Sequence, residues 1–330
     1  MGLFGGRGYG GGGGFGGLRW VIAGVIALVG VVSYFSRTQV NPVTGEKQRV
    51  MLTFDEEKAL GLQSAPQMIQ QMGARVVDPR RDRRAALVHE VGHKLVNSSD
   101  AAKSPYVGNF NFYLLDDEMI NAFALPGGQI FITTALFGEF QNEAQLAGVL
   151  GHEIGHVIHR HSAEHMAKNR LGQSIVGAVA VGASGEDGAG RMAGVAAAMA
   201  NQMLQLKYGR QDETESDLTG IDYMVDAGYD PRGMLGVMQV LKKAGGGRRT
   251  PEFMQSHPLP ETRLQEIARI IEKNYTPDQL ARLSEGRPLP GGGGGARLAA
   301  EREEALPERS TPRGQPQQQR RSGPRDEERW

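Results

Sequence analysis

The longest apolar run of the chain lies near its N-terminus and predicts a membrane segment. Trp20 to Phe35 carries no charged residue and has aromatic residues at both ends, as is typical of membrane interfaces. Its 16 residues fall just short of the roughly 17 to 25 that span a bilayer, but Leu18 and the long side chain of Arg19 extend it. We expect an uncleaved anchor over residues 18–36. The alternatives are a buried core helix and a cleaved signal peptide, although no small-x-small cleavage pattern follows Val32.

The rest of the chain shows helical and strand patterns in turn. Amphipathic spacing predicts helix over residues 51–97, after a turn at residues 41–45. Aromatic and β-branched residues predict strands at residues 106–115 and 122–133, the second interrupted by a turn or bulge at Pro126-Gly127-Gly128. Further helices are predicted over residues 143–161 with Asn142 as cap, over residues 171–206 with a loop at 184–190, and over residues 205–227.

Together these patterns predict an α+β fold that is mostly helical and has a small β-sheet. Residues 1–17 form a glycine-rich N-terminal segment before the predicted anchor at 18–36. Residues 284–330 contain too few apolar side chains to fold, and we expect a disordered tail there. The remaining residues, 37–283, are long enough to form the folded part of the chain.

Composition narrows the possible chemistry. Lys+Arg and Asp+Glu each number 37, so no excess of positive charge favours nucleic acid as a partner. The chain has no cysteine, which excludes disulfides, thiol nucleophiles and thiolate ligands to zinc. Any zinc site must therefore use His, Asp or Glu.

The pattern His-Glu-x-x-His places two imidazoles one helical turn apart beside a carboxylate, and it occurs at residues 89–93 and 152–156. At about 100° per residue, His89 and His93 lie roughly 150° from the centre of their helix's apolar face, and therefore face solvent. The second helix is apolar almost all round, with His152 and His156 in its narrow polar strip. Buried polar groups need a partner, which favours a metal there, although hydrogen-bonded core histidines are the alternative.

A third metal ligand is predicted on the helix over residues 205–227. Glu213 and Asp217 lie within about 40° of the apolar positions Leu206 and Met224, whereas Glu215 points about 160° away and is expected to be solvated. We therefore predict Glu213 as the third ligand and Asp217 as the acceptor that orients a ligand histidine. An acidic surface helix is the alternative. With His152, His156 and Glu213 on one zinc ion per chain, Glu153 becomes the predicted general base of peptide hydrolysis.

Further blocks of sequence occur in a fixed order around the second motif. They are Asn41-Pro42-Val43-Thr44-Gly45, the stretch from Asn121 to Gly128, Arg210-x-x-Glu213-x-x-x-Asp217, and Ser256-His257-Pro258-x-x-x-x-Arg263. This order, over roughly residues 41–275, resembles the gluzincin zinc metalloendopeptidases of the BepA and LoiP type, relatives of HtpX and the CAAX prenyl protease. In that family the metal motif follows the strand block, which favours residues 152–156 over residues 89–93.

The resemblance implies a zincin-like metallopeptidase domain and additional site residues. His257 or Arg263 would stabilise the oxyanion, or His257 would close the open zinc position and keep the enzyme latent. The alternative is a turn at His257-Pro258 and a surface pair between Arg263 and Glu266. The active-site edge strand, which would take extended polypeptides by strand addition, would comprise Asn121, Ala122, Phe123, Ala124 and Leu125.

These expectations give a membrane-anchored zinc metalloendopeptidase that cleaves extended or misfolded proteins in envelope quality control. The resemblance implies that the catalytic domain, anchored by the single helix at residues 18–36, lies outside the cytoplasm, in the periplasm. The rival function is a non-catalytic or latent zinc-binding chaperone or interaction module at the membrane, in which the fourth zinc position is closed. The oligomeric state stays open.

Overall fold

The computed structural model describes residues 14–183, 207–245, 251–258 and 261–291. Its larger sheet has four strands in the order β3-β4-β6-β5, in which β4 and β6 are parallel and the other neighbours are antiparallel. The strand β5 therefore lies at one edge, as the family resemblance implied. A separate hairpin pairs β1 with β2. The strands are β1 (Thr38–Val40), β2 (Lys47–Arg49), β3 (Arg75–Val76), β4 (Asn111–Asp116), β5 (Ala122–Leu125) and β6 (Gln129–Thr133).

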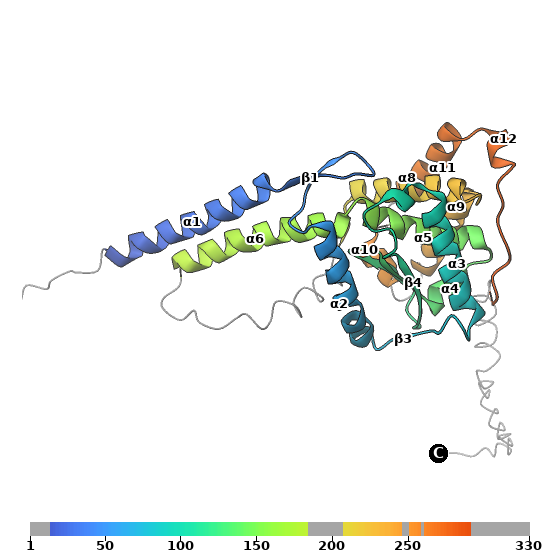
Figure 1. Ribbon diagram of the computed structural model, residues 1–330, viewed down its shortest axis with the longest axis horizontal. Coiled ribbons are helices and arrows are strands. Elements are labelled where there is room, and N and C mark those ends of the chain that lie inside the picture. The colour runs from blue at the N-terminus through green and yellow to red at the C-terminus, as the bar shows by residue number, and fades with distance from the viewer. Residues whose placement is uncertain (1–13, 184–206, 246–250, 259–260, 292–330) are drawn as a thin grey trace, which may run out of the picture. The chain divides into compact units, whose positions relative to one another are not determined.

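The helix α5 (Glu143–Ile158) is the centre of the domain, and every one of its residues is buried except Gln145, which is partly exposed. The Asn142 side chain caps it by accepting a hydrogen bond from the Gln145 amide, as predicted. Around it pack α3, α8, α9 and the strand β5, and Figure 1 shows it among the three helices. The other helices of the folded domain are α2 (Phe54–Met72), α3 (Arg83–Ser98), α4 (Thr134–Glu139), α8 (Arg210–Asp226), α9 (Arg232–Gly245), α10 (Glu252–Ser256), α11 (Glu261–Asn274) and α12 (Pro277–Leu280).

The continuous helix predicted over residues 51–97 is wrong. The helix α2 ends at Met72 because Gly73 adopts φ +67°, a left-handed conformation that favours glycine, and its amide closes the last turn. The short strand β3 and a turn follow before α3 begins, capped by Asp82. The first predicted strand is also shorter than expected, because residues 106–109 form turns and β4 starts at Asn111.

The chain changes direction after α5, at Arg160. This residue has φ +58°, in the left-handed region that costs a non-glycine residue energy. Its buried guanidinium compensates by binding Glu57: Nε donates to Oε1 at 3.0 Å, while Nη1 donates to Gln39 Oε1 at 2.9 Å. The active-site helix was predicted to continue to His161. Instead a new helix, α6 (His161–Ala183), starts there in another direction.

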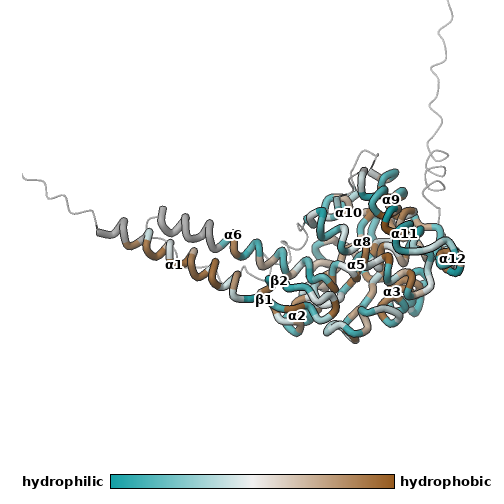
Figure 2. Tube along the Cα trace, turned by 90° about the horizontal axis from the view of Figure 1, so that it is seen from above, coloured by the Kyte–Doolittle hydropathy of each residue, from teal (hydrophilic) through white to brown (hydrophobic). Residues whose placement is uncertain are grey.

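The N-terminal helix α1 (Gly14–Ser36) packs alongside α6, as Figures 1 and 2 show. Trp20, Val25, Leu28 and Val32 on α1 are more than half exposed, and Figure 2 shows the apolar character of much of this helix. Among the described residues, no helix has both the length and the apolar character needed to cross a membrane.

The folded chain continues past the predicted boundary at residue 283. The Glu143 amide donates to the Arg287 carbonyl at 3.0 Å, and the Leu289 amide donates to the Gln141 carbonyl at 2.9 Å. Leu289 is buried in the core. Residues 284–289 thus pack on the start of α5, while residues 292–330 of the predicted tail lie outside the described residues, as do residues 184–206 of the predicted helix over 171–206.

Candidate metal centre

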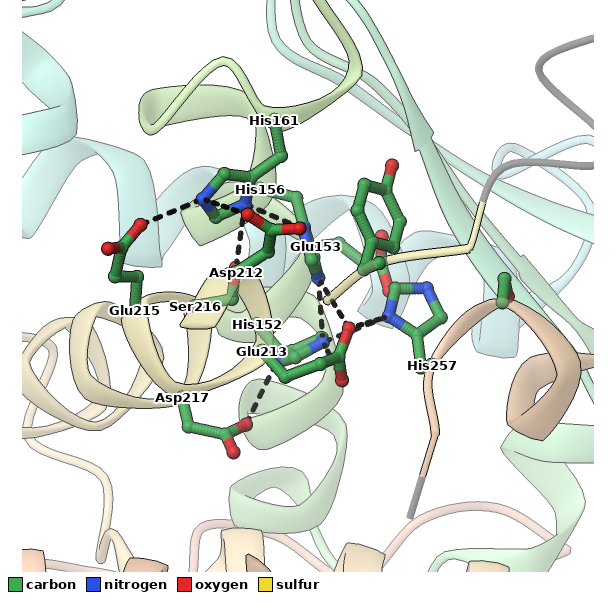
Figure 3. Close-up of polar contacts among 12 residues, drawn as sticks. His152, Glu153, His156, His161, Asp212, Glu213, Glu215, Ser216, Asp217 and His257 are labelled. Carbon is green, nitrogen blue, oxygen red and sulfur yellow. Dashed lines mark hydrogen bonds and ion pairs between the residues drawn. The ribbon is translucent and has the colours of Figure 1, made fainter. Parts of the chain in front are cut away.

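Four candidate metal ligands come together from three parts of the chain (Figure 3). His152 and His156 lie one turn apart on α5, Glu213 lies in the first turn of α8, and His257 follows α10. One nitrogen or oxygen atom from each residue lies within 4.8 Å of the others. All four side chains are almost completely buried, since none of these residues is more than 3% exposed.

Close helix packing brings Glu213 to the histidines. At Gly155 a Cβ atom would lie 2.9 Å from the Cα of Ser216, and at Gly151 it would lie 3.0 Å from the carbonyl oxygen of Gly220. Side chains at these two glycines would therefore separate α5 from α8. The glycines inside and just before the metal motif thus let the backbones approach until the carboxylate of Glu213 meets the two imidazoles.

The distances between the donor atoms suit a metal ion. His152 Nε2 lies 3.0 Å from His156 Nε2, His156 Nε2 lies 3.4 Å from Glu213 Oε1, and His152 Nε2 lies 3.7 Å from Glu213 Oε2. Donors at about 2.0 to 2.1 Å from a tetrahedral zinc ion are about 3.3 to 3.5 Å apart. Glu213 Oε2 is buried in an ion pair with Arg263, while Glu213 Oε1 is the oxygen that lies near His156 Nε2. Imidazole and carboxylate donors in this arrangement fit zinc, and no thiolate is required.

Asp217 and Arg263 hold the side chains of His152 and Glu213 in place through hydrogen bonds and an ion pair. Asp217 Oδ1 lies 2.9 Å from His152 Nδ1, so that the imidazole donates to the carboxylate and keeps Nε2 free for a metal. The Arg263 guanidinium donates to both oxygens of Asp217 at 2.7 Å and also makes a close ion pair with Glu213. Burial by itself raises the pKa of Asp217, but Arg263 outweighs it and holds the pKa below its usual value.

Arg263 does not make the surface pair with Glu266 that stood as the alternative. Its donors are used by Asp217, by Glu213, and by the Pro258 carbonyl at 3.3 Å. With these groups occupied, Arg263 has little capacity left for a substrate oxyanion. The geometry therefore favours a positioning role for Arg263 over the predicted oxyanion role.

Glu153 has the surroundings expected of a proton carrier. It follows His152 on α5, is 1% exposed, and has no hydrogen bond to its Oε1 atom. Burial raises its pKa, while His257 and His152 act against that rise. A carboxyl group with a raised pKa takes up a proton more readily than a solvated one, as a general base must.

His257 closes the cluster on the side where α10 ends. Its Nδ1 atom lies 2.9 Å from Glu213 Oε1 and 3.3 Å from His152 Nε2, and its Nε2 atom lies 3.7 Å from Glu153 Oε1. The ring of Phe253 stacks on it, with 4.4 Å between centroids. Burial lowers the pKa of His257, but Glu213 and Glu153 outweigh this and raise it. A cavity of about 440 Å³ touches the site at Glu213 and Arg263.

The first His-Glu-x-x-His motif gathers no further ligands within the described part of the chain. On α3, His89 is exposed and His93 is partly buried against the ring of Phe112. Their own rings lie 4.3 Å apart, but no acid joins them in a group that could hold a metal among the described residues. Their position on the solvent side of the helix agrees with the sequence prediction.

Other buried side chains around the site were missed or misplaced by the sequence analysis. The ring of Tyr208 packs on His156 with 4.0 Å between centroids. Its position just before the Arg210 block was the only local signal. Glu215 was predicted to be solvated, yet its Oε2 atom lies 3.1 Å from the Nε2 atom of the buried His161. That prediction is wrong, because His161, the first residue of α6, reaches this side of α8.

The predicted substrate strand lies beside the centre. The strand β5 forms the sheet edge and contacts α5, and Asn121 precedes it as a buried residue. The four strand residues Ala122, Phe123, Ala124 and Leu125 pair with β6 on one side. Within the described residues the other side of β5 has no partner strand.

Comparison with known proteins agrees with this geometry. The chain is 34% identical over 186 residues to the beta-barrel assembly-enhancing protease of Escherichia coli K12, which covers 54% of this chain and 37% of the relative. The protein of the same name from Yersinia pestis is 31% identical over 257 residues, 73% of this chain and 50% of the relative. The mitochondrial metalloendopeptidase OMA1 of Schizosaccharomyces pombe is 26% identical over 250 residues, 76% and 71% respectively.

This chain thus spans half or less of the two bacterial relatives. The family model for peptidase family M48 matches residues 82–271, which is more than half of the chain. The match contains the buried cluster on α5 and α8, His257 and Arg263, and it also contains His89 and His93 of α3. Family, relatives and geometry agree on a metalloendopeptidase, and the chain belongs to peptidase family M48.

Proposed function

We propose that this chain is a zinc-dependent endopeptidase that hydrolyses peptide bonds in extended or misfolded proteins. His152, His156 and Glu213 would hold one zinc ion, and Glu153 would act as general base. The observation that carries the proposal is the position of Glu153, a buried carboxylate with an unbonded oxygen beside the three ligands. A purely structural zinc site needs no such group.

The chain's own residues divide the work of hydrolysis. When bound, zinc lowers the pKa of a coordinated water toward about 7 and polarises the substrate carbonyl. Glu153 takes a proton from the attacking water and delivers it to the nitrogen of the leaving amine. The raised pKa of Glu153 suits both transfers. Asp217 keeps the proton of His152 on Nδ1, so that Nε2 faces the metal.

Substrate would bind as an added strand on the free edge of β5. Backbone hydrogen bonds would supply affinity there, with little dependence on substrate sequence. This mode requires an unfolded or extended polypeptide, because the strand edge can pair only with a segment free of its own pairing. Broad specificity for misfolded proteins follows.

His257 would hold the enzyme latent. Its Nδ1 atom lies among the candidate ligands, where a fourth ligand would otherwise be water or substrate. The sequence left open whether His257 acts on the oxyanion or as a closing ligand, and the short distances to Glu213 and His152 favour closure. Activation would then require the segment after α10 to withdraw His257 from the cluster.

Cleavage of casein by full-length variants tests the proposal. With zinc supplied, His257→Ala should cleave faster than wild type, and Glu153→Gln combined with His257→Ala should lose nearly all activity while keeping bound zinc. Glu272→Gln, at an exposed carboxylate on α11, is the matched control. Equal cleavage with and without Glu153 would refute the general-base role.

The second candidate is a non-catalytic zinc-binding chaperone or interaction module. The closed arrangement of four possible ligands favours it, because structural zinc sites are closed in this way. If the His257→Ala variant binds zinc, suppresses aggregation of an unfolded protein and yet cleaves nothing, this candidate replaces the first.

We further propose that residues 18–36 associate the protein with a membrane, with the peptidase domain on the extracytoplasmic, periplasmic side. Support comes from the uncharged run between Trp20 and Phe35 and from the exposed apolar side chains of α1. Fractionation of cells that express the chain, together with a topology reporter after Trp330, tests this. Recovery in the soluble fraction would refute it.

A further inference from the structure

A second group of possible ligands lies next to the proposed zinc centre and shares no residue with it. His159 follows the last turn of α5, His161 begins α6, and Glu215 lies on α8. His161 Nε2 lies 3.1 Å from Glu215 Oε2, and His159 Nδ1 lies 3.8 Å from the same oxygen. One donor atom from each residue lies within 4.8 Å of the others. Figure 3 shows His161 between Glu215 and His156.

The contacts of His159 leave its Nδ1 atom available to bind a metal ion. Its Nε2 atom lies 2.8 Å from the Thr219 hydroxyl oxygen, and we place the proton of the ring on Nε2, so that Nδ1 keeps its lone pair. The residue is 8% exposed, and Nδ1 is buried with no hydrogen-bond partner. Leaving a buried acceptor unpaired costs about 1 to 3 kcal/mol. A bound cation would remove that cost.

The surrounding charge is favourable for a cation. Glu46 Oε2 lies 3.5 Å from His159 Nδ1, beyond a good hydrogen bond but close enough to become a fourth donor. Asp212 Oδ1 lies 4.0 Å from His161 Nε2. The neighbouring cation, Arg160, directs its guanidinium to Glu57. Acids therefore dominate around the two imidazoles.

We propose that His159, His161 and Glu215 form a second site for a divalent transition-metal ion, with Glu46 or water completing it. Two imidazoles and carboxylate oxygens are donors that zinc and its neighbours in the first transition row accept. The separations of 3.1 and 3.8 Å bracket those expected for ligands around zinc, about 3.3 to 3.5 Å. This site is additional to the one that would perform hydrolysis.

The two sites are linked by one proton. His156 Nδ1 lies 2.9 Å from His161 Nδ1, a distance at which one ring nitrogen must donate and the other accept. With a metal on His156 Nε2, the proton of the His156 ring lies on Nδ1, which donates a hydrogen bond to His161 Nδ1. The proton of the neutral His161 ring then lies on its Nε2 atom, which donates a hydrogen bond to Glu215.

A metal on His161 Nε2 reverses this arrangement. His161 Nδ1 then carries the proton and donates it to His156 Nδ1, so that a neutral His156 holds its own proton on Nε2, where the catalytic metal would bind. Occupation of the second site therefore opposes occupation of the first. This antagonism rests on the proposed function, and it makes the second site an inhibitory one at high metal concentration.

Zinc stoichiometry of the full-length protein tests the site without reference to proteolysis. Dialysis against buffered Zn²⁺ and elemental analysis should show one tight and one weaker equivalent in wild type. His159→Ala should lose only the weaker equivalent. The matched control is His165→Ala, at a histidine that pairs with Asp212 at 2.8 Å outside the ligand group. It should keep both.

Removal of the catalytic ligand tests the linkage. His156→Ala should bind one equivalent at least tenfold more tightly than the weaker site of wild type, and His156→Ala with His159→Ala should bind none. His152→Ala, which leaves the pair of His156 and His161 intact, provides a second variant should His156→Ala fail to fold. It should also keep one equivalent that His159→Ala removes.

Two results would overturn the second site. The first is that His159→Ala binds as much zinc as wild type. The second is that adding His159→Ala to His152→Ala leaves the zinc content unchanged. If the second equivalent binds but does not inhibit casein cleavage, the proposed antagonism is wrong. Failure of the proposed function is seen separately, as absence of the tight equivalent in wild type or as cleavage that does not depend on Glu153.

Discussion

Replacement of Asp217 by Asn tests the arrangement behind the metal centre. Asp217 is 2% exposed and accepts three hydrogen bonds, from His152 Nδ1 at 2.9 Å and from two nitrogens of Arg263 at 2.7 Å. Asparagine keeps the shape but removes the charge, and its amide group can only donate where the second carboxylate oxygen accepted. One of the three hydrogen bonds must therefore be lost, and Arg263 loses one of its two counterions.

The structure sets the size of the effect. Removing one partner of a buried ion pair costs about 3 to 5 kcal/mol. Because Glu213 remains beside Arg263, we expect the lower end of that range, about 3 kcal/mol, for the metal-free protein. Zinc affinity should fall about 10- to 100-fold, since His152 is no longer held with Nε2 toward the metal.

Urea unfolding in the presence of a chelator measures the first quantity, and zinc titration measures the second. Asp278→Asn, at an exposed carboxylate of α12, is the control and should change neither. Combining Asp217→Asn with Arg263→Gln should cost less than the sum of the single variants by about 0.5 to 3 kcal/mol, because the two side chains are in contact. Additive losses, or a stable Asp217→Asn protein with unchanged zinc affinity, would refute the arrangement.

Other predictions concern stability and the choice of motif. Burial raises the pKa of Asp212, but hydrogen bonds from His165 and the Gly209 amide outweigh it and lower the pKa to about 2. The ionised carboxylate of Asp212 therefore stabilises the fold at pH values above its ordinary pKa of about 4. The melting temperature should fall as the pH drops from about 4 toward 2. An unchanged melting temperature for Asp212→Asn at neutral pH would contradict this. Zinc content should be unchanged when both histidines of the α3 motif, residues 89 and 93, become alanine. Glu57→Ala should cost about 3 kcal/mol or more in urea unfolding, because it leaves Arg160 buried without its counterion; a loss below about 1 kcal/mol would argue against that pair.

Helical periodicity accounts for the parts of the site that were predicted. His152 and His156 lie at positions i and i+4, as do Glu213 and Asp217, and such pairs share a helix face whatever surrounds them. The apolar positions around the first pair predicted that α5 is buried, and all its residues except Gln145 are buried. Asn142 was predicted as its cap from the same local rules.

The same rules failed where a second element covers a helix face. Glu215 lies on the side of α8 opposite the predicted inward row, and His161, the first residue of α6, contacts it there at 3.1 Å. The break that places α6 there depends on Arg160 in a left-handed conformation, which a buried ion pair with Glu57 accompanies. Glu57 is 103 positions away in the sequence, so no local pattern contains this information.

By itself, the sequence determined the helices that carry the ligands, the row on which each ligand lies, and the family to which the motifs belong. Only the tertiary structure decided that His257 lies among the ligands, that Arg263 binds Asp217 and Glu213, and that His159, His161 and Glu215 meet. Periodicity is a property of neighbouring residues along the chain. Charge pairing and burial are properties of residues that only the folded chain brings together.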